Sequence, residues 1–180
     1  MSNLTAAPDT EKPSSTSTDS TAFTGDAVLK LAQGIVCGKL NLAFTFDWAR
    51  QIVESYELVS IPRAPSWVLG AVNVNGAIVP VVDLFNYFSE SNQPAQAERD
   101  QRLLVGGIQA EDSEAALAVV FSQSAVQLEY ATQPIGQSDV LPRRLLEVCR
   151  GIAQDDSGKQ YLEIDASKLM DALSIELSVI

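Results

Sequence analysis

Most of the chain after residue 24 consists of short stretches in which apolar and polar residues alternate, separated by residues that favour turns. In residues 40–46 every second residue is leucine or phenylalanine, which is the period of a half-buried β-strand. The apolar residues 35–37 come just before, and Gly38-Lys39 separates the two stretches. The pattern therefore predicts a β-hairpin over residues 35–46.

Residues 72–82, a mostly apolar stretch that Asn75-Gly76 interrupts, are predicted to be a pair of strands or one bent strand. Both residues of this dipeptide tolerate a positive φ, so it is a strong signal for a tight turn. Asp83 follows at once, and its side chain can cap a short helix that ends near residue 88.

The remaining apolar runs predict further short strands and little helix. Many strands at short spacing are typical of a barrel or of paired small barrels. Asp165 can cap a terminal helix whose Leu169, Ala172 and Leu173 face inward. The other predicted strands are 51–54, 103–108, 115–121, 122–130, 151–153 and 161–164, and a further helix is predicted over 141–149.

Residues 1–24 differ from the rest of the chain. They are rich in Ser, Thr and Pro and contain few residues that a core could bury, so we expect a disordered tail. No basic region followed by an apolar run is present there, which argues against a secretory signal. The longest apolar stretch, 77–84, is too short to span a bilayer. We therefore expect a cytoplasmic protein without direct membrane insertion.

The charge of the chain restricts its partners. Twelve basic residues stand against 23 acidic ones, which gives a formal net charge of -11. A phosphate backbone or an anionic membrane surface would be repelled by this field, because both are usually bound through clustered Lys and Arg. Nucleic acid is therefore not an expected partner.

The residues needed for common catalytic and metal sites are missing or badly spaced. The chain contains no histidine, which removes the commonest general base and metal ligand. Residues 155–158 lack the ligand spacing of a calcium loop, and residues 34–39 are one residue short of a phosphate loop. Cys37 and Cys149 are expected to be small buried residues. Trp48 and Trp67 are candidates for the core or for an interface.

Residues 61–84, IPRAPSWVLGAVNVNGAIVPVVDL, are similar to the signature of CheW-like domains. The shared features are a Trp-Val-x-Gly run, then Val-Asn-x-x-Gly leading into Val-Pro-Val-x-Asp-Leu. Residues 40–53 resemble the opening hairpin and crossover of the family, and residues 151–173 resemble its closing hairpin and helix. The resemblance covers residues 25–180, which is everything except the tail.

This resemblance implies a mainly β fold of two intertwined five-stranded SH3-like barrels with short helices. It also implies an adaptor, not an enzyme, that couples the cytoplasmic tip of a chemoreceptor to the CheW-like regulatory domain of a histidine kinase. No cofactor or metal is expected. Two alternatives remain: an adaptor of a pilus, gliding or other chemosensory pathway, and a sensor that binds a small ligand between the barrels.

The resemblance places the partner contacts on the crossover and on the Asn-Gly turn. In the family the positions of Gln51 and Asn75 usually carry Glu and Arg, so both charges of a potential ion pair are replaced here by amides. The two amides are either a neutral substitute for that pair or unrelated changes of side chains that never meet. For two of the five candidates, Ile52 and Ile78, core packing is the competing interpretation. The predicted partner-binding residues are Ala49, Gln51, Ile52, Asn75 and Ile78.

Overall fold

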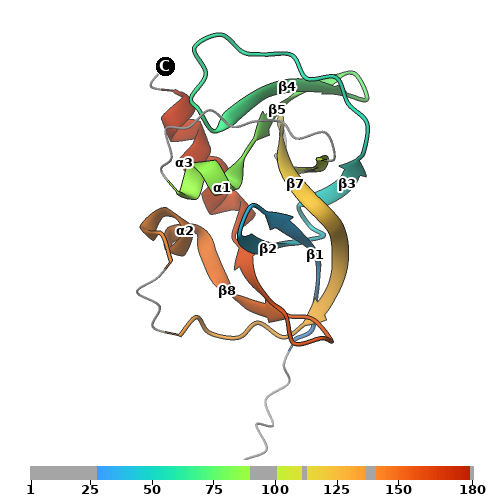
Figure 1. Ribbon diagram of the computed structural model, residues 1–180, viewed down its shortest axis with the longest axis vertical. Helices are drawn as coiled ribbons and strands as arrows, with labels where there is room; N and C mark the ends of the chain where they lie inside the picture. The colour runs from blue at the N-terminus through green and yellow to red at the C-terminus, as the bar shows by residue number, and fades with distance from the viewer. Residues whose placement is uncertain (1–27, 90–100, 111–112, 137–140, 179–180) are drawn as a thin grey trace, which may run out of the picture.

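The computed structural model describes residues 28–89, 101–110, 113–136 and 141–178, so the predicted tail lies outside the described residues. None of the helices in these ranges is long and apolar enough to span a membrane. The described residues form nine strands and three helices (Figure 1). In chain order they are β1 Lys30–Cys37, β2 Leu40–Thr45, β3 Ala49–Val53, β4 Val68–Val74, β5 Ala77–Val82, α1 Leu84–Phe88, β6 Arg102–Ala110, β7 Ser113–Tyr130, α2 Arg143–Val148, β8 Cys149–Gln154, β9 Gln160–Ile164 and α3 Ala166–Leu177.

The strands form two intertwined five-stranded barrels, as the resemblance implied. Barrel 1 has the order β3-β6-β7-β5-β4 and comes from the middle of the chain. Barrel 2 has the order β7-β1-β2-β9-β8 and combines the first two strands with the last two. The parallel pairs β5–β7 and β2–β9 join segments that lie far apart in the sequence.

Strand β7 belongs to both barrels and runs along the whole molecule (Figure 1). Its first half pairs with β6 as far as Phe121, and its second half pairs with β1 as far as Tyr130. The sequence predicted two separate strands over 115–121 and 122–130, and this division is wrong. The irregular point is Gln123, which has a φ of 67° and lies at the register shift of the β1 pairing, between Ser122 opposite Val36 and Val126 opposite Gly34. The strand therefore bulges there without ending.

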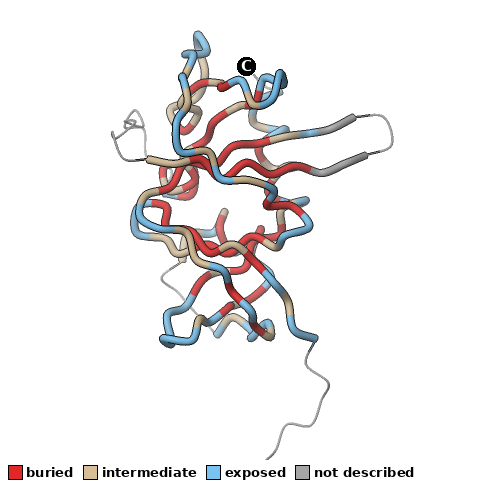
Figure 2. Tube along the Cα trace, turned by 90° about the vertical axis from the view of Figure 1, so that its right-hand side faces the viewer, coloured by how far each residue is buried: buried red, intermediate tan, exposed pale blue. Residues whose placement is uncertain are grey.

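Three clusters of buried side chains form the core, one inside each barrel and a larger one between them (Figure 2). The larger cluster includes Trp48 and Trp67, with exposed fractions of 3% and 6%. Leu169 and Leu173 of α3 also pack into it. Both tryptophans are therefore core residues in this chain and not surface anchors.

The local signals of the sequence are realised as predicted. Asn75 has a φ of 53° in the turn between β4 and β5. The carboxylate of Asp83 accepts a hydrogen bond from the Asn86 N–H at 3.0 Å and caps α1. Asp165 caps α3 in the same way through the Lys168 N–H at 3.2 Å.

The predicted helix over 141–149 is shorter in the structure and covers Arg143–Val148. Pro142 precedes it with an extended backbone, and Cys149 is already extended because it pairs with Ile164 in barrel 2. Cys149 is consequently half-buried, whereas Cys37 is buried as expected. Both cysteines are free thiols.

Candidate protein-interaction site

A β-bulge shapes strand β3, which carries three of the predicted partner-binding residues. Ala49 pairs with Gly106 and Gln51 pairs with Val105, so Arg50 is the extra residue on the β3 side. A bulge interrupts the strict alternation of a strand and re-aims neighbouring side chains. Arg50 and Gln51 consequently line the same groove, although they are adjacent in the sequence.

The start of β3 is held in place by Trp48. Its indole ring packs on Phe44, with ring centroids 4.8 Å apart, and its carbonyl oxygen accepts a hydrogen bond from the Gly107 N–H at 3.2 Å. The ring is buried in the cluster between the barrels. The strand is therefore anchored at one end by the core that both barrels share.

The groove lies at one mouth of barrel 1 and has a volume of about 420 Å³. Of the five predicted residues, Gln51, Asn75 and Ile78 line it. We call this concave surface the barrel-1 groove. Its lining residues are Arg50, Gln51, Val74, Asn75, Ala77, Ile78, Val79, Val105, Gly106, Gly107 and Ala116.

Gln51 and Asn75 line the same groove, although they come from different elements. Gln51 reaches the groove from β3, and Asn75 reaches it from the turn between β4 and β5. Asn75 is exposed and Gln51 is partly buried. The turn is fixed by Asn73, whose side-chain oxygen accepts a hydrogen bond from the Gly76 N–H at 2.8 Å.

Ile78 is the most exposed apolar side chain of this groove, with 72% of its surface accessible. It pairs with Asn73 across the β4–β5 hairpin and does not enter the core of barrel 1. Core packing, the competing interpretation of this residue, therefore does not hold for Ile78.

The other two predicted residues lie outside the lining of the groove. Ala49 is only 6% exposed and packs in the cluster between the barrels. Ile52 is 37% exposed and pairs with Leu104 of β6. Their contact with a partner stays a prediction, and for Ala49 it would have to be made through the main chain or after a rearrangement.

Arg50 is the charged residue among those that line the barrel-1 groove, and the sequence did not single it out. The alternation around residue 50 suggests an ordinary strand, and a bulge leaves no clear local signal. The remaining lining residues are apolar side chains, glycines and the two amides. The surface can therefore receive an apolar side chain beside hydrogen-bonding groups.

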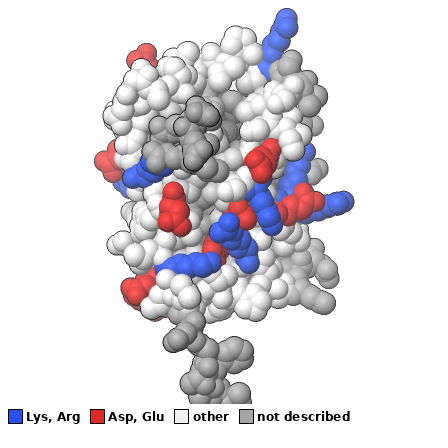
Figure 3. Space-filling model, turned by 180° about the vertical axis from the view of Figure 1, so that it is seen from behind, with Lys and Arg blue, Asp and Glu red and all other residues white. Residues whose placement is uncertain are grey.

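A second groove, of about 380 Å³, lies between the two barrels. It is lined by Asp47, Arg50 and Arg150 together with the first turn of α3, and Arg150 donates a hydrogen bond to Asp165 at 2.9 Å. Charged side chains also gather across the middle of the molecule when it is seen from behind (Figure 3). This groove is thus not the apolar pocket that a small-ligand sensor would favour.

In the described part of the chain, no three His, Cys, Asp or Glu side chains are grouped as metal ligands.

Comparison with known proteins agrees with this architecture. The CheW-like domain family matches residues 34–174 of the chain. Among solved structures, the scaffolding protein TtCheW from Thermoanaerobacter tengcongensis superposes with a TM-score of 0.58 and 18% sequence identity, over 76% of this chain and 89% of that one. No curated protein sequence matches the chain. At this identity the structural likeness concerns the fold alone, whereas the family match extends over most of the sequence. The chain belongs to the family of CheW-like domains.

Proposed function

We propose that this protein is a cytoplasmic chemotaxis-type adaptor that joins chemoreceptor tips to a histidine kinase by binding the CheW-like regulatory domain of that kinase. Membership of the CheW-like family supports an adaptor or scaffold role without catalysis. The observation that carries the proposal is the exposed Ile78 beside Gln51 and Asn75 in the barrel-1 groove. A protruding apolar side chain at the rim of a concave, mostly uncharged surface is typical of a protein-binding site.

The test measures binding of the full chain to the kinase regulatory domain and to receptor tips encoded by the same genome. We expect Ile78→Ser to weaken binding to at least one of them by about tenfold, because truncating an apolar anchor of an interface often costs about 1 to 2 kcal/mol. The matched control is Ile175→Ser in α3, since Ile175 is similarly exposed at 68% but does not line the groove. Full-strength binding by Ile78→Ser, or an equal loss in the control, would refute the role of the groove.

The same surface also fits the alternative of an adaptor for pilus, gliding or another chemosensory pathway. Gln51 and Asn75 replace the charges that are usual in the family, and charged residues at an interface mainly govern specificity and association rate. A partner of this chain is thus expected to differ from that of an ordinary family member. Binding as tight and as salt-sensitive as an ordinary member's, with an ordinary kinase domain, would remove the argument for a divergent pathway.

A further inference from the structure

Three apolar side chains at the start of barrel 2 face solvent. Val28, Leu29 and Leu31 are 78%, 62% and 50% exposed. The neighbouring side chains on β1 point inward, since Ala32 is fully buried and Lys30 reaches the buried Glu163 at 2.8 Å. A strand with one face in a core normally carries polar residues on its other face. Leu29 and Leu31, which are exposed on either side of Lys30, therefore indicate a contact surface.

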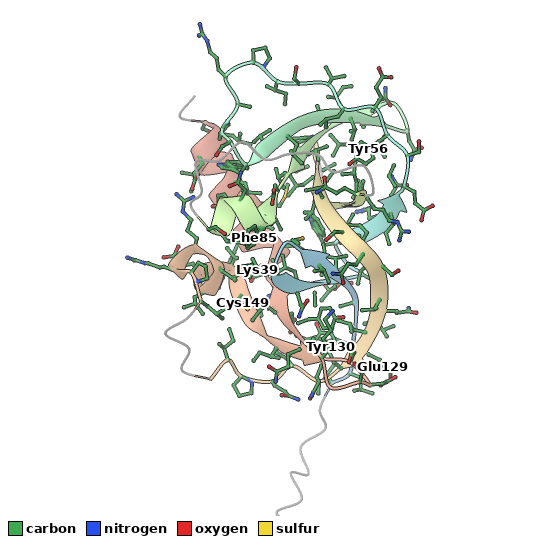
Figure 4. The ribbon with its side chains drawn as sticks, viewed as in Figure 1. Lys39, Tyr56, Phe85, Glu129, Tyr130 and Cys149 are labelled. Atoms are coloured by element: carbon green, nitrogen blue, oxygen red, sulfur yellow. The ribbon has the colours of Figure 1, made fainter. Side chains whose placement is uncertain are left out.

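Acidic residues border Leu31, which lies opposite Glu129 in the β1–β7 pair. Leu31 and Glu129 line a groove of about 550 Å³ together with the turn that joins β8 to β9. That turn, the start of β1 and the end of β7 lie together at one end of the molecule (Figure 1), where Glu129 is seen beside Tyr130 (Figure 4). The lining residues are Leu31, Val126, Gln127, Leu128, Glu129, Asp155, Asp156 and Ser157, which include three carboxylates and no Lys or Arg.

Hydrogen bonds within the turn hold the carboxylate of Asp155 in place. The carboxylate oxygen Oδ1 of Asp155 accepts hydrogen bonds from the N–H groups of Ser157 and Lys159, each at 2.9 Å. Hydrogen bonding from Ser157 lowers the pKa of Asp155, so this carboxylate stays ionised at neutral pH. Lys30 of β1 does not neutralise the groove, because it is paired with the buried Glu163. Lys159, at the end of the turn, acts on Asp155 but is one cation against three carboxylates.

We propose that Val28, Leu29 and Leu31, with the acidic residues Glu129, Asp155 and Asp156, form a docking surface for a partner segment that combines apolar side chains with Lys or Arg. We call this surface the barrel-2 strip. Charge complementarity selects such an occupant. A second copy of the chain, with a formal net charge of -11, is repelled. Residues 1–27 of the same chain do not complement the strip either, because they contain four acidic residues and one lysine.

The barrel-2 strip is separate from the barrel-1 groove and does not rest on the proposed adaptor function. The groove is built from β3 to β7 in barrel 1, whereas the strip is built from β1, the end of β7 and the β8–β9 turn of barrel 2. A chain with both surfaces could hold two partners at once. Failure of one surface in a binding experiment therefore leaves the other unaffected.

The test uses the full chain and a fluorescent ten-residue peptide of alternating leucine and lysine, with a leucine–glutamate peptide as the negative probe. Binding is measured by fluorescence anisotropy at low and high salt. We expect Leu29→Ser with Leu31→Ser to weaken binding of the leucine–lysine peptide by at least about fivefold, because two apolar contacts are lost. Glu129→Gln with Asp156→Asn should weaken it by a similar factor and flatten its salt dependence.

Matched controls separate the strip from the general attraction between an acidic protein and a basic peptide. Ile175→Ser removes an equally exposed apolar side chain, and Glu57→Gln with Asp171→Asn removes two exposed carboxylates on other elements. These controls and Ile78→Ser should bind within about twofold of the unchanged chain. Equal losses in the controls, or undiminished binding by the strip variants, would overturn the proposal. So would strip variants whose main effect, in sedimentation, is the loss of a dimer of the chain itself.

Discussion

The indole ring of Trp48 lies directly against the main chain of Gly106, where a Cβ atom would come 2.4 to 2.5 Å from ring atoms. No side chain fits in that space unless the ring moves. Trp48 belongs to the core between the barrels, and Gly106 lies in β6 opposite Ala49 of β3. The pair therefore couples the packing of the two barrels to the position of the strand that borders the barrel-1 groove.

We expect Gly106→Ala to lower the free energy of unfolding by about 1 to 3 kcal/mol, because the new methyl group overpacks a filled core. Chemical denaturation followed by tryptophan fluorescence measures this. Gly136→Ala is the control, since nothing lies within 4 Å of a Cβ at position 136. It should change the free energy of unfolding by less than about 0.5 kcal/mol. Equal stability of both variants would contradict this prediction and would show that the Trp48 ring moves aside without an energetic cost.

The ion pair between the half-buried Lys30 and the buried Glu163 in barrel 2 gives a second prediction. Glu163 is fully buried, and its carboxylate accepts hydrogen bonds from Lys30 at 2.8 Å and from the Thr132 hydroxyl at 2.7 Å. Lys30→Met leaves a buried charge without its cation, so we expect it to destabilise the protein by about 3 kcal/mol. Arg143→Met breaks the exposed pair with Glu147 and should cost less than about 1 kcal/mol. A similar, small effect of both substitutions in urea denaturation would contradict this difference.

Asp165 makes the stability of the fold depend on pH. Burial by itself would raise the pKa of Asp165, but hydrogen bonds from Arg150 and from the Lys168 N–H outweigh burial and lower the pKa. A carboxyl whose pKa is lowered in the folded state stabilises that state above its unfolded pKa and loses this contribution as the pH falls through the folded pKa.

We therefore expect Asp165→Asn to be less stable than the unchanged protein at pH 7, by about 1 kcal/mol, and the difference to shrink as the pH falls below about 4. Thermal unfolding between pH 7 and pH 2.5 measures this. Asp171→Asn, at an exposed position later in α3, is the control. A difference that stays constant down to pH 2.5 would assign the loss to packing and not to the charge.

The two cysteines should differ in reactivity. Burial, and then the nearby Asp83 carboxylate, raise the pKa of the Cys37 thiol well above its usual range, and its Sγ donates to the Val120 carbonyl at 3.4 Å. Burial raises the pKa of Cys149 as well, but that residue is partly exposed. In Cys149→Ser, an aromatic disulfide reagent at pH 8 should label Cys37 only as fast as the protein unfolds. Rapid labelling of that variant in native buffer would contradict the burial of Cys37.

Restoring the charges that are usual in the family tests the role of the two amides. We expect Gln51→Glu with Asn75→Arg to fold normally and to change both the affinity for the kinase regulatory domain and its salt dependence. Asn75 has a φ of 53°, a left-handed conformation that arginine adopts less readily than asparagine. We therefore expect Asn75→Arg alone to lower the free energy of unfolding by about 1 kcal/mol. The two single variants complete a double-mutant cycle. An additive result with unchanged partner choice would mean that the two positions act separately.

Local chemistry made several parts of this structure predictable. The turn at Asn75-Gly76 and the caps at Asp83 and Asp165 involve residues within three positions of one another, so the sequence contains everything they need. The resemblance of residues 61–84 to the family predicted the two-barrel fold, whereas the spacing of the predicted strands alone indicated only a barrel or a pair of barrels. Of the residues that line the barrel-1 groove, the resemblance singled out Gln51, Asn75 and Ile78 but not Arg50, and the role of these residues in binding stays a prediction.

What the sequence by itself determined is therefore most of the strands, the turns and the caps, together with the family. Only the tertiary structure decided that β7 is one strand shared by both barrels, that a bulge turns Arg50 toward the groove and that Ala49 is buried. The physical reason is that alternation shows which face of a strand is buried but not which strand lies beside it. Pairings such as Leu42 with Leu162, or Val81 with Ala118, are set by the closure of the barrels, and no local pattern encodes them.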